Sequence, residues 1–166
     1  DKLFYKKIQM KVIILAGGLG SRLEEITKLI PKPMVLIKSK PIILYVMRTF
    51  IKFGHYDFII ALGYKGEKIL EYFSKKKITT SIKSELKKGL KVELKLFGKN
   101  CSIIFLDTGL KTMTGGRLKR ASKLIQDDKF FATYGDGLGD INISKLKSFH
   151  KKKNKMVTVT AVNPPA

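Results

Sequence analysis

Val12 to Arg22 reads V-I-I-L-A-G-G-L-G-S-R, an apolar run that ends in a glycine-rich turn and then an arginine. Short apolar runs bounded by glycine are typical of strands that are buried on both faces of a parallel sheet. We therefore expect a first strand over Lys11 to Ala16. A turn directly after such a strand lies at the edge of the sheet where open α/β sheets bind their ligands.

The turn itself has the composition of a phosphate-binding loop. Gly17, Gly18 and Gly20 can adopt positive φ and carry no Cβ that would hold a ligand away from the backbone N–H groups. Ser21 adds a hydroxyl donor, and Arg22 adds a planar positive group. The turn therefore predicts a cradle for a polyphosphate at the end of the first strand.

The residues around this turn exclude one common phosphate loop and disfavour another. A Walker loop needs Gly-Lys followed by Ser or Thr, whereas Gly20 is followed by Ser21 and Arg22. A dinucleotide-binding fingerprint that starts at Gly18 needs its third glycine at position 23, which is Leu23. For the glycines taken alone, a tight structural turn remains the alternative.

Pro31-Lys32-Pro33 places a restrained positive charge close to that loop in the chain. The two prolines fix φ on either side of the lysine and disfavour helix for the residues before them. We therefore expect Lys32 to lie on a stiff extended segment. A lysine held in this way can clamp a phosphate bound at the glycine-rich turn.

Three further polar stretches follow apolar runs or open an apolar-periodic helix. They are Asp107-Thr108-Gly109, Thr112 to Arg120, and Thr133-Tyr134-Gly135-Asp136-Gly137. We expect all three to be loops at strand or helix ends, where an open α/β sheet binds ligands. Asp136, between two glycines, has the freedom to face a metal ion, and its alternative role is that of a turn aspartate.

Apolar periodicity predicts alternating strands and helices along most of the chain. The expected strands are Lys11 to Ala16, Phe58 to Leu62, Ser102 to Leu106, Phe130 to Tyr134 and Met156 to Val162; the expected helices are Ile42 to Phe53, Glu67 to Phe73, Arg117 to Ile125 and Ile143 to Lys151. This order predicts an α/β fold, a Rossmann-like open, mostly parallel sheet with helices on both faces. The lysine-rich segment from Thr79 to Asn100 receives no assignment.

Charge is the most unusual property of the composition. The 166 residues hold 34 Lys and Arg against 13 Asp and Glu, a net charge of +21, which alone points to nucleic acid or an anionic surface. However, only four of the basic residues are arginines, and no RNA-binding, zinc-ligand or helix-turn-helix motif accompanies the scattered lysines. We therefore expect no nucleic-acid partner.

Two further observations bear on the cellular setting. No apolar stretch approaches the roughly 20 residues of a membrane span, so we expect no membrane partner. The single cysteine, Cys101, excludes an internal disulfide and suits the reducing cytoplasm, and we expect it to be a small hydrophobic residue of the core. The sequence therefore predicts a cytoplasmic protein.

Several of these motifs together resemble a known family. Leu15 to Leu23 with Pro31-Lys32-Pro33 resembles the signature of the nucleotide-sugar pyrophosphorylases, the sugar-phosphate nucleotidyltransferases. One branch, the glucose-1-phosphate cytidylyltransferases, is resembled at Gly63 to Gly66, Asp107 to Gly109, Met113 to Arg120 and Tyr134 to Gly137. The resemblance runs from Met10 to Pro165, and several motifs in one order are more specific than any one of them.

The resemblance implies an activity and its ligands. Members of this branch transfer a cytidylyl group from CTP to glucose 1-phosphate, giving CDP-glucose and pyrophosphate, for nucleotide-sugar and surface polysaccharide biosynthesis. The implied cofactor is Mg²⁺, and the implied partners are CTP and a sugar 1-phosphate. Relatives assemble, so a homo-oligomer is expected for the full-length protein.

The resemblance also implies roles for particular residues. Arg22 and Lys32 would be catalytic, and Asp136 would bind the metal ion. Ser21 and Arg22 would hold the leaving β- and γ-phosphates, whereas Lys32 would approach the α-phosphate. The remaining nucleotide contacts would come from Leu15, Ala16, Gly17, Gly18, Gly20, Gly115, Gly116, Arg117 and Gly135, with Gly115 to Arg117 in a loop over the nucleotide.

Two departures from the family's pattern shape the expected domain organisation. Family members continue past position 166 and there supply a second metal-binding aspartate and a lysine for the sugar phosphate. We therefore expect residues 10–166 to be an incomplete nucleotidyltransferase domain, truncated at its carboxyl end, which binds nucleotide but turns over little. Residues 1–9 are expected to be an upstream or non-native extension, since family members start at the position of Met10.

Other functions remain open on the residues alone. A related pyrophosphorylase could use another nucleotide or sugar phosphate, because Leu23 to Pro33 also suits the broader superfamily. A non-catalytic nucleotide-binding module is a further alternative, and charge-driven binding of nucleic acid is another.

Overall fold

A computed structural model describes residues 9–18, 29–75, 77 and 79–162, and the structural statements below concern these residues. Their elements, in chain order, are β1 (Val12–Ala16), the 3-10 helix η2 (Lys32–Met34), β2 (Leu36–Ile37), β3 (Lys40–Pro41), α2 (Ile42–Lys52), β4 (Asp57–Leu62), α3 (Gly66–Ser74), α4 (Thr80–Lys88), β5 (Leu90–Leu96), β6 (Lys99–Asp107), α5 (Thr114–Ser122), β7 (Phe131–Tyr134) and α6 (Ile143–Lys153).

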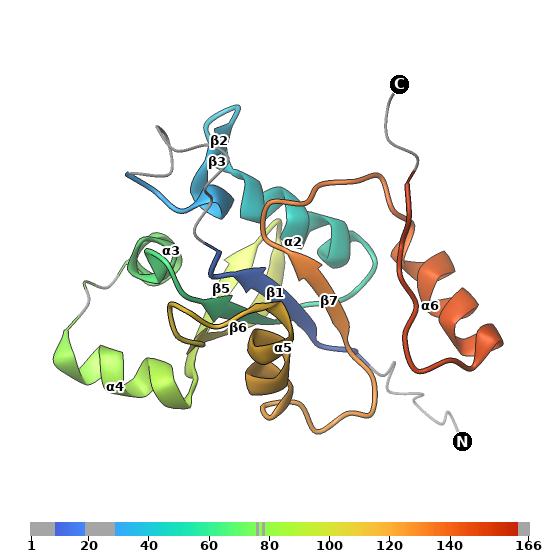
Figure 1. Cartoon of the computed structure of the whole chain (residues 1–166). Helices are drawn as coiled ribbons and strands as arrows, with labels where there is room; N and C mark the ends of the chain where they lie inside the picture. The colour runs from blue at the N-terminus through green and yellow to red at the C-terminus, as the bar shows by residue number, and fades with distance from the viewer. Residues whose placement is uncertain (1–8, 19–28, 76, 78, 163–166) are drawn as a thin grey trace, which may run out of the picture.

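The main sheet has the strand order β5-β6-β4-β1-β7. β6, β4, β1 and β7 are parallel, whereas β5 pairs with β6 in the antiparallel direction. At the centre of the sheet, Ile14 is in register with Ile60 on one side and with Thr133 on the other. The expected α/β fold with an open, mostly parallel sheet is confirmed (Figure 1).

Helices cover both faces of this sheet because side chains alternate along each strand. Val12, Ile14 and Ala16 point into a core that contains the apolar sides of α2 and α3. Ile13 and Leu15 point to the opposite face and pack with Ala121 of α5. Figure 1 shows α2 and α5 on opposite sides of β1. Both faces of β1 are therefore buried, as its apolar sequence predicts.

The segment from Thr79 to Asn100, which the sequence left open, forms α4 and the edge strand β5. The Thr79 hydroxyl caps α4 by accepting a hydrogen bond from the Ile82 N–H. Along β5, half-buried apolar residues alternate with exposed Lys91, Glu93 and Lys95. This alternation is typical of a strand with one face in solvent. The lysines occupy the solvent-facing positions, so a lysine-rich composition does not argue against a strand here.

The expected strand from Met156 to Val162 is wrong. These residues form no strand, and Met156 and Val162 are 98% and 82% exposed. The segment runs back beside α6, where the Thr158 hydroxyl lies 2.8 Å from His150 Nδ1 (Figure 1). A strand needs a neighbouring strand to pair its N–H and C=O groups, and among the described residues none lies beside this segment.

Cys101 is a core residue, as expected, with 2% of its surface exposed. Burial raises the pKa of its thiol, so less of the reactive thiolate forms at a given pH. If exposing Cys101 by local opening costs about 3 kcal/mol, iodoacetamide should label it about 100-fold more slowly in the folded chain than in urea. Mass spectrometry of timed reactions measures this difference, and equal rates would contradict the burial.

The helices that the structure describes include none with the length and apolar character of a membrane span.

Candidate functional site

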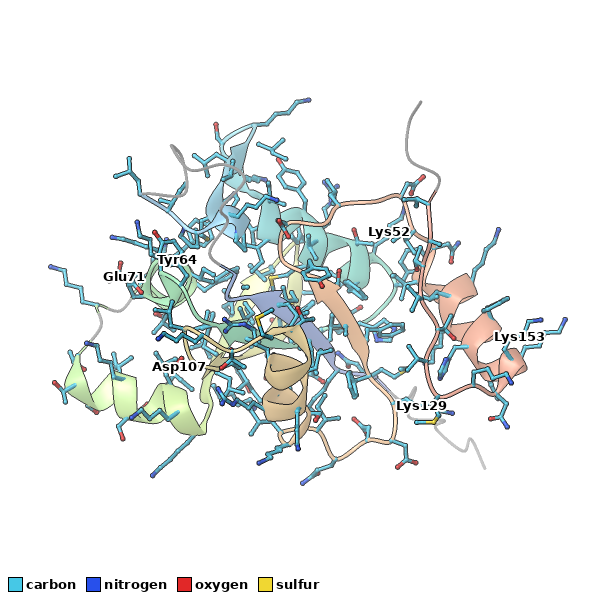
Figure 2. All side chains as sticks on the ribbon, in the orientation of Figure 1. Lys52, Tyr64, Glu71, Asp107, Lys129 and Lys153 are labelled. Carbon is cyan, nitrogen blue, oxygen red and sulfur yellow. The ribbon has the colours of Figure 1, made fainter. Side chains whose placement is uncertain are left out.

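A cavity of about 470 Å³ opens at the carboxyl ends of β1 and β7. Its walls come from four segments that are distant in the chain: Leu15 to Gly18, Lys32 with Pro33, Leu110 to Thr114 with Arg117, and Tyr134 with Asp136. In Figure 2, the labels of Tyr64 and Asp107 mark the carboxyl edge of the sheet, and Lys129 marks the opposite edge. The cavity therefore occupies the position at which open α/β sheets bind ligands.

Lys32 and Asp136 meet inside this cavity. Lys32 Nζ lies 2.7 Å from Asp136 Oδ2, and the two side chains are 37% and 24% exposed. An ion pair at this distance shows that the proline-flanked lysine and the glycine-flanked carboxylate face the same space. The structure therefore brings together the lysine and the carboxylate that the sequence singled out.

The conformation around Lys32 differs from the expected extended segment. Pro31 is extended with ψ 147°, but Lys32–Met34 forms one turn of 3-10 helix closed by the Met34 N–H and the Pro31 carbonyl at 2.8 Å. Proline is tolerated in a first helical turn because its missing N–H would have no partner there. The prolines thus restrain Lys32 within a tight turn, and Pro33 is buried beneath it.

Gly135 holds the carboxyl end of β7 against the cavity floor. Its N–H donates a 2.9 Å hydrogen bond to the carbonyl oxygen of Leu15. A Cβ at this position would lie 3.0 Å from Cγ of Pro33 and 3.3 Å from the Leu15 oxygen. A side chain here would press on Pro33 and on the end of β1, so Gly135 favours the close approach of β7 that carries Asp136 toward Lys32.

Gly115, Gly116 and Arg117 do not form the expected loop, because they belong to the first turn of α5 (Thr114–Ser122). Met113 caps that helix with an extended backbone, and no side chain caps it by a hydrogen bond. The first N–H groups of a helix carry partial positive charge, so this end of α5 favours an anion. It adjoins the cavity at Met113 and Thr114.

Arg117 is 5% exposed, and burial lowers the pKa of its guanidinium, although arginine stays protonated in proteins. Its terminal nitrogens donate to the carbonyl oxygens of Gly17 and Leu110, among other acceptors, at 2.8 and 3.1 Å. Arg117 therefore lines the cavity from beneath the glycine-rich turn rather than projecting freely over it.

Of the other proposed nucleotide-binding residues, some lie among the described residues and some do not. Leu15 and Ala16 are buried at the end of β1 and line the cavity with Gly17 and Gly18. Neither Gly17 nor Gly18 has φ in the left-handed region, so the structure does not use the conformational freedom of glycine at these two positions. Gly20, Ser21 and Arg22 lie outside the described residues.

Sequence reasoning assigned no role to Lys111 and Tyr134, which also line the cavity. Lys111 lies in the stretch between β6 and α5, and Tyr134 is the last residue of β7. The only sequence signal was their position in or next to the polar stretches at expected strand ends, Tyr134 directly before Gly135 and Lys111 two residues after Gly109. Lys111 adds a positive charge to a cavity that already contains Lys32 and Arg117.

Asp136 is the one acidic side chain among the described residues that line the cavity. Its carboxylate already has a cation beside it, the Lys32 ammonium. Among the described residues, no group of three or more His, Cys, Asp and Glu is arranged to hold a metal ion. Mg²⁺ is often bound by one or two carboxylates together with phosphate oxygens and water, so a single carboxylate in a positively charged cavity suits that mode.

Comparison with protein families and known proteins finds similar sequences along most of this chain. The model of the family described as nucleotidyl transferase matches residues 11–166. A probable glucose-1-phosphate cytidylyltransferase of Bacillus subtilis is 41% identical over 157 residues, which cover 93% of this chain and 61% of the relative. The glucose-1-phosphate cytidylyltransferase of Salmonella typhimurium is 43% identical over 94% of this chain and 62% of the relative.

Solved structures with a similar fold also cover most of this chain. HddC from Yersinia pseudotuberculosis has a TM-score of 0.64 and 29% identity, covering 85% of this chain and 54% of the other. A UDP-glucose pyrophosphorylase complexed with UDP-glucose has a TM-score of 0.65 at 22% identity, which concerns the fold alone. The chain thus spans about three fifths of the length of its curated relatives and about half of these structures.

Proposed function

Because the chain belongs to the nucleotidyl transferase family, we propose that its site binds CTP with Mg²⁺ and serves the transfer of a cytidylyl group to glucose 1-phosphate. The observation that carries this proposal is the Lys32–Asp136 ion pair in a cavity bordered by Gly17 and Gly18. Lys32 would provide a cation for a phosphate, Asp136 would provide a carboxylate for a metal ion, and the two glycines would leave their backbone accessible to a nucleotide. In the full-length protein we propose a cytoplasmic homo-oligomer.

The chemistry needs little from the protein beyond alignment and charge. An oxygen of the sugar phosphate forms a bond to the α-phosphorus of CTP, and the bond from that phosphorus to the bridging oxygen breaks as pyrophosphate leaves. With a second pKa of about 6, the attacking phosphate is largely ionised at neutral pH, so no protein base is required. Catalysis then depends on positioning and on neutralising negative charge.

The described residues divide this work among them. Lys32 would contact the α-phosphate, and the backbone at Gly17 and Gly18 would hold the nucleotide. Asp136 would hold Mg²⁺, which would neutralise phosphate charge. The amino end of α5 at Gly115 and Gly116 adds partial positive charge, and Gly135 keeps Asp136 in place. Ser21 and Arg22 are proposed, on the family resemblance alone, to hold the β- and γ-phosphates.

A second candidate differs in its substrate. A D-glycero-alpha-D-manno-heptose 1-phosphate guanylyltransferase of Campylobacter jejuni is 35% identical over 138 residues, which cover 83% of this chain. Lys32 and Asp136 would bind any nucleoside triphosphate, because they would contact phosphate and metal rather than base. The base must therefore be decided by experiment.

Thermal unfolding with different nucleotides tests the proposed function. Ligand at 100 times its Kd stabilises a protein by about 2.7 kcal/mol. For a chain of this size we expect CTP with Mg²⁺ to raise Tm by about 5 to 10 °C. A larger shift with GTP or UTP would favour the second candidate. If single-stranded RNA raised Tm and none of the nucleoside triphosphates did, both candidate functions would be contradicted.

A further inference from the structure

We infer that Arg117 is a positioning residue: its guanidinium joins the carboxyl ends of three neighbouring strands and thereby sets the geometry of the Gly17–Gly18 turn. The role in fixing the strand ends stands on the structure alone. The consequence for nucleotide binding rests on the proposed function.

The hydrogen bonds of Arg117 reach across the sheet from α5. Nη2 donates to the carbonyl oxygen of Gly17, just after β1, at 2.8 Å. Nη1 donates to the carbonyl oxygen of Leu62, the last residue of β4, at 3.0 Å and to the Thr108 hydroxyl, just after β6, at 2.6 Å. One side chain therefore contacts the ends of β1, β4 and β6 together.

These bonds begin where the pairing of the strands ends. The last residue pair between β1 and β4 is Ala16 with Leu62, so Gly17 is the first residue beyond that register. The fully buried Thr108 hydroxyl also donates to the Leu62 oxygen, at 2.6 Å, which links Arg117 to β4 a second time. The Gly17 oxygen also accepts a 3.3 Å hydrogen bond from the Tyr64 N–H, and the Leu62 oxygen accepts one of 3.0 Å from the Thr108 N–H. The guanidinium therefore reinforces the last backbone hydrogen bonds at this end of the sheet.

The space taken by the guanidinium explains the glycine at position 17. A Cβ on Gly17 would overlap Nη1 and Cζ of Arg117 and lie 3.0 Å from Nε, which are its three nearest neighbours among the described residues. Among the residues that the structure describes, nothing lies within 4 Å of a Cβ on Gly18. A side chain at position 17 would displace a guanidinium that four hydrogen bonds hold in place, so Gly17 makes room for Arg117 and the two residues form one structural unit.

Gly63 shows a related but distinguishable constraint. A Cβ there would also meet Nη1 of Arg117, but it would lie 2.6 Å from the Gly17 oxygen and 2.8 Å from its Cα as well. Because two of these three atoms are backbone, removing the guanidinium cannot make room for a side chain at position 63. We therefore expect that loss of the Arg117 guanidinium makes a side chain tolerable at position 17 but not at position 63.

A double-mutant cycle on Tm tests the unit. Overpacking and the loss of buried hydrogen bonds each cost enough that we expect Gly17→Ala and Arg117→Met each to lower Tm by roughly 5 °C or more. The two changes together should cost clearly less than their sum, because the shorter methionine side chain would leave room for the added methyl. Gly63→Ala should show no such relief, and Gly18→Ala alone should leave Tm nearly unchanged.

Additive effects of Gly17→Ala and Arg117→Met would overturn the inference. If Arg117→Met does not fold, the comparison of Gly17→Ala with Gly18→Ala still decides it, since equal Tm values would show that the guanidinium does not restrict position 17. A second variant, Arg117→Lys, keeps the charge but not the fork, and it should lower Tm because a lysine cannot reach the same acceptors.

Nucleotide affinity and chemical rescue test the positioning role apart from stability. Measured by calorimetry at a temperature where the variant is folded, CTP with Mg²⁺ should bind Arg117→Ala about 10-fold more weakly, the order expected when aligned donors are lost. Millimolar guanidinium chloride should restore much of that affinity, whereas the same concentration of sodium chloride should not.

Arg120→Ala is the matched control on the same helix, because Arg120 donates to Thr108 and Thr112 but not to the ends of β1 and β4. Guanidinium should not increase its affinity. Unchanged CTP affinity in Arg117→Ala would overturn the positioning role. If the unaltered chain binds no nucleotide, the proposed function fails, and the Tm cycle alone decides whether Arg117 fixes the strand ends.

Discussion

Lys32→Met is expected to weaken binding of CTP with Mg²⁺ by about 10- to 100-fold, because a hydrogen bond to a charged group contributes about 1.5 to 3 kcal/mol. Methionine keeps most of the side-chain length and removes the charge. The Lys32–Asp136 pair is partly exposed, so its loss should change Tm little. Isothermal titration calorimetry on the folded variant measures the affinity.

Lys40→Met provides the control for total charge. Lys40 is exposed on β3 and does not line the cavity, so its replacement lowers the net charge equally. We expect its affinity to stay within about twofold of the unaltered chain, since an isolated surface charge contributes little through solvent. An equal loss in both variants would show that Lys32 acts only through the overall charge.

Asp136→Asn is expected to remove most of the contribution of the metal ion to CTP binding. Mutating even an outer partner of a metal site typically costs about 10- to 100-fold in affinity, and we expect at least this loss for a direct ligand. Titration of CTP with and without Mg²⁺ measures it. An affinity that rises with Mg²⁺ as steeply in Asp136→Asn as in the unaltered chain would exclude Asp136 as the ligand.

The ion pair predicts that Lys32→Met, which weakens nucleotide binding, strengthens the binding of a divalent cation in the absence of nucleotide. Without nucleotide, the Lys32 ammonium lies 2.7 Å from the carboxylate, so a divalent cation must compete with it. Lys32→Met should therefore bind Mn²⁺ more tightly than the unaltered chain, whereas Asp136→Asn should bind it more weakly. Electron paramagnetic resonance of free Mn²⁺ distinguishes these signs. Weaker Mn²⁺ binding by Lys32→Met would contradict the competition.

Part of the site followed directly from sequence order. Lys32 is close in sequence to the glycine-rich turn, and Asp136 follows an expected strand. Because the carboxyl ends of parallel strands lie together, the proximity of the two residues could be predicted. Their direct pairing could not, since it depends on Gly135 packing against Pro33 and Leu15. The helical start at Thr114 was missed because two adjacent glycines favour a loop in isolation, whereas here they lie in a first turn.

The sequence by itself determined the buried parallel strands and the edge that carries the site, because a run such as Val12–Ala16 can bury both faces only inside a covered sheet. Only the tertiary structure decided that Leu90–Leu96 pairs as an antiparallel edge, that 156–162 pairs with no described strand, and that Gly17 makes room for Arg117. Apolar periodicity is a local property of the chain. Hydrogen-bond partners and the space around a Cβ come from residues far away in sequence, so the assembled fold alone specifies them.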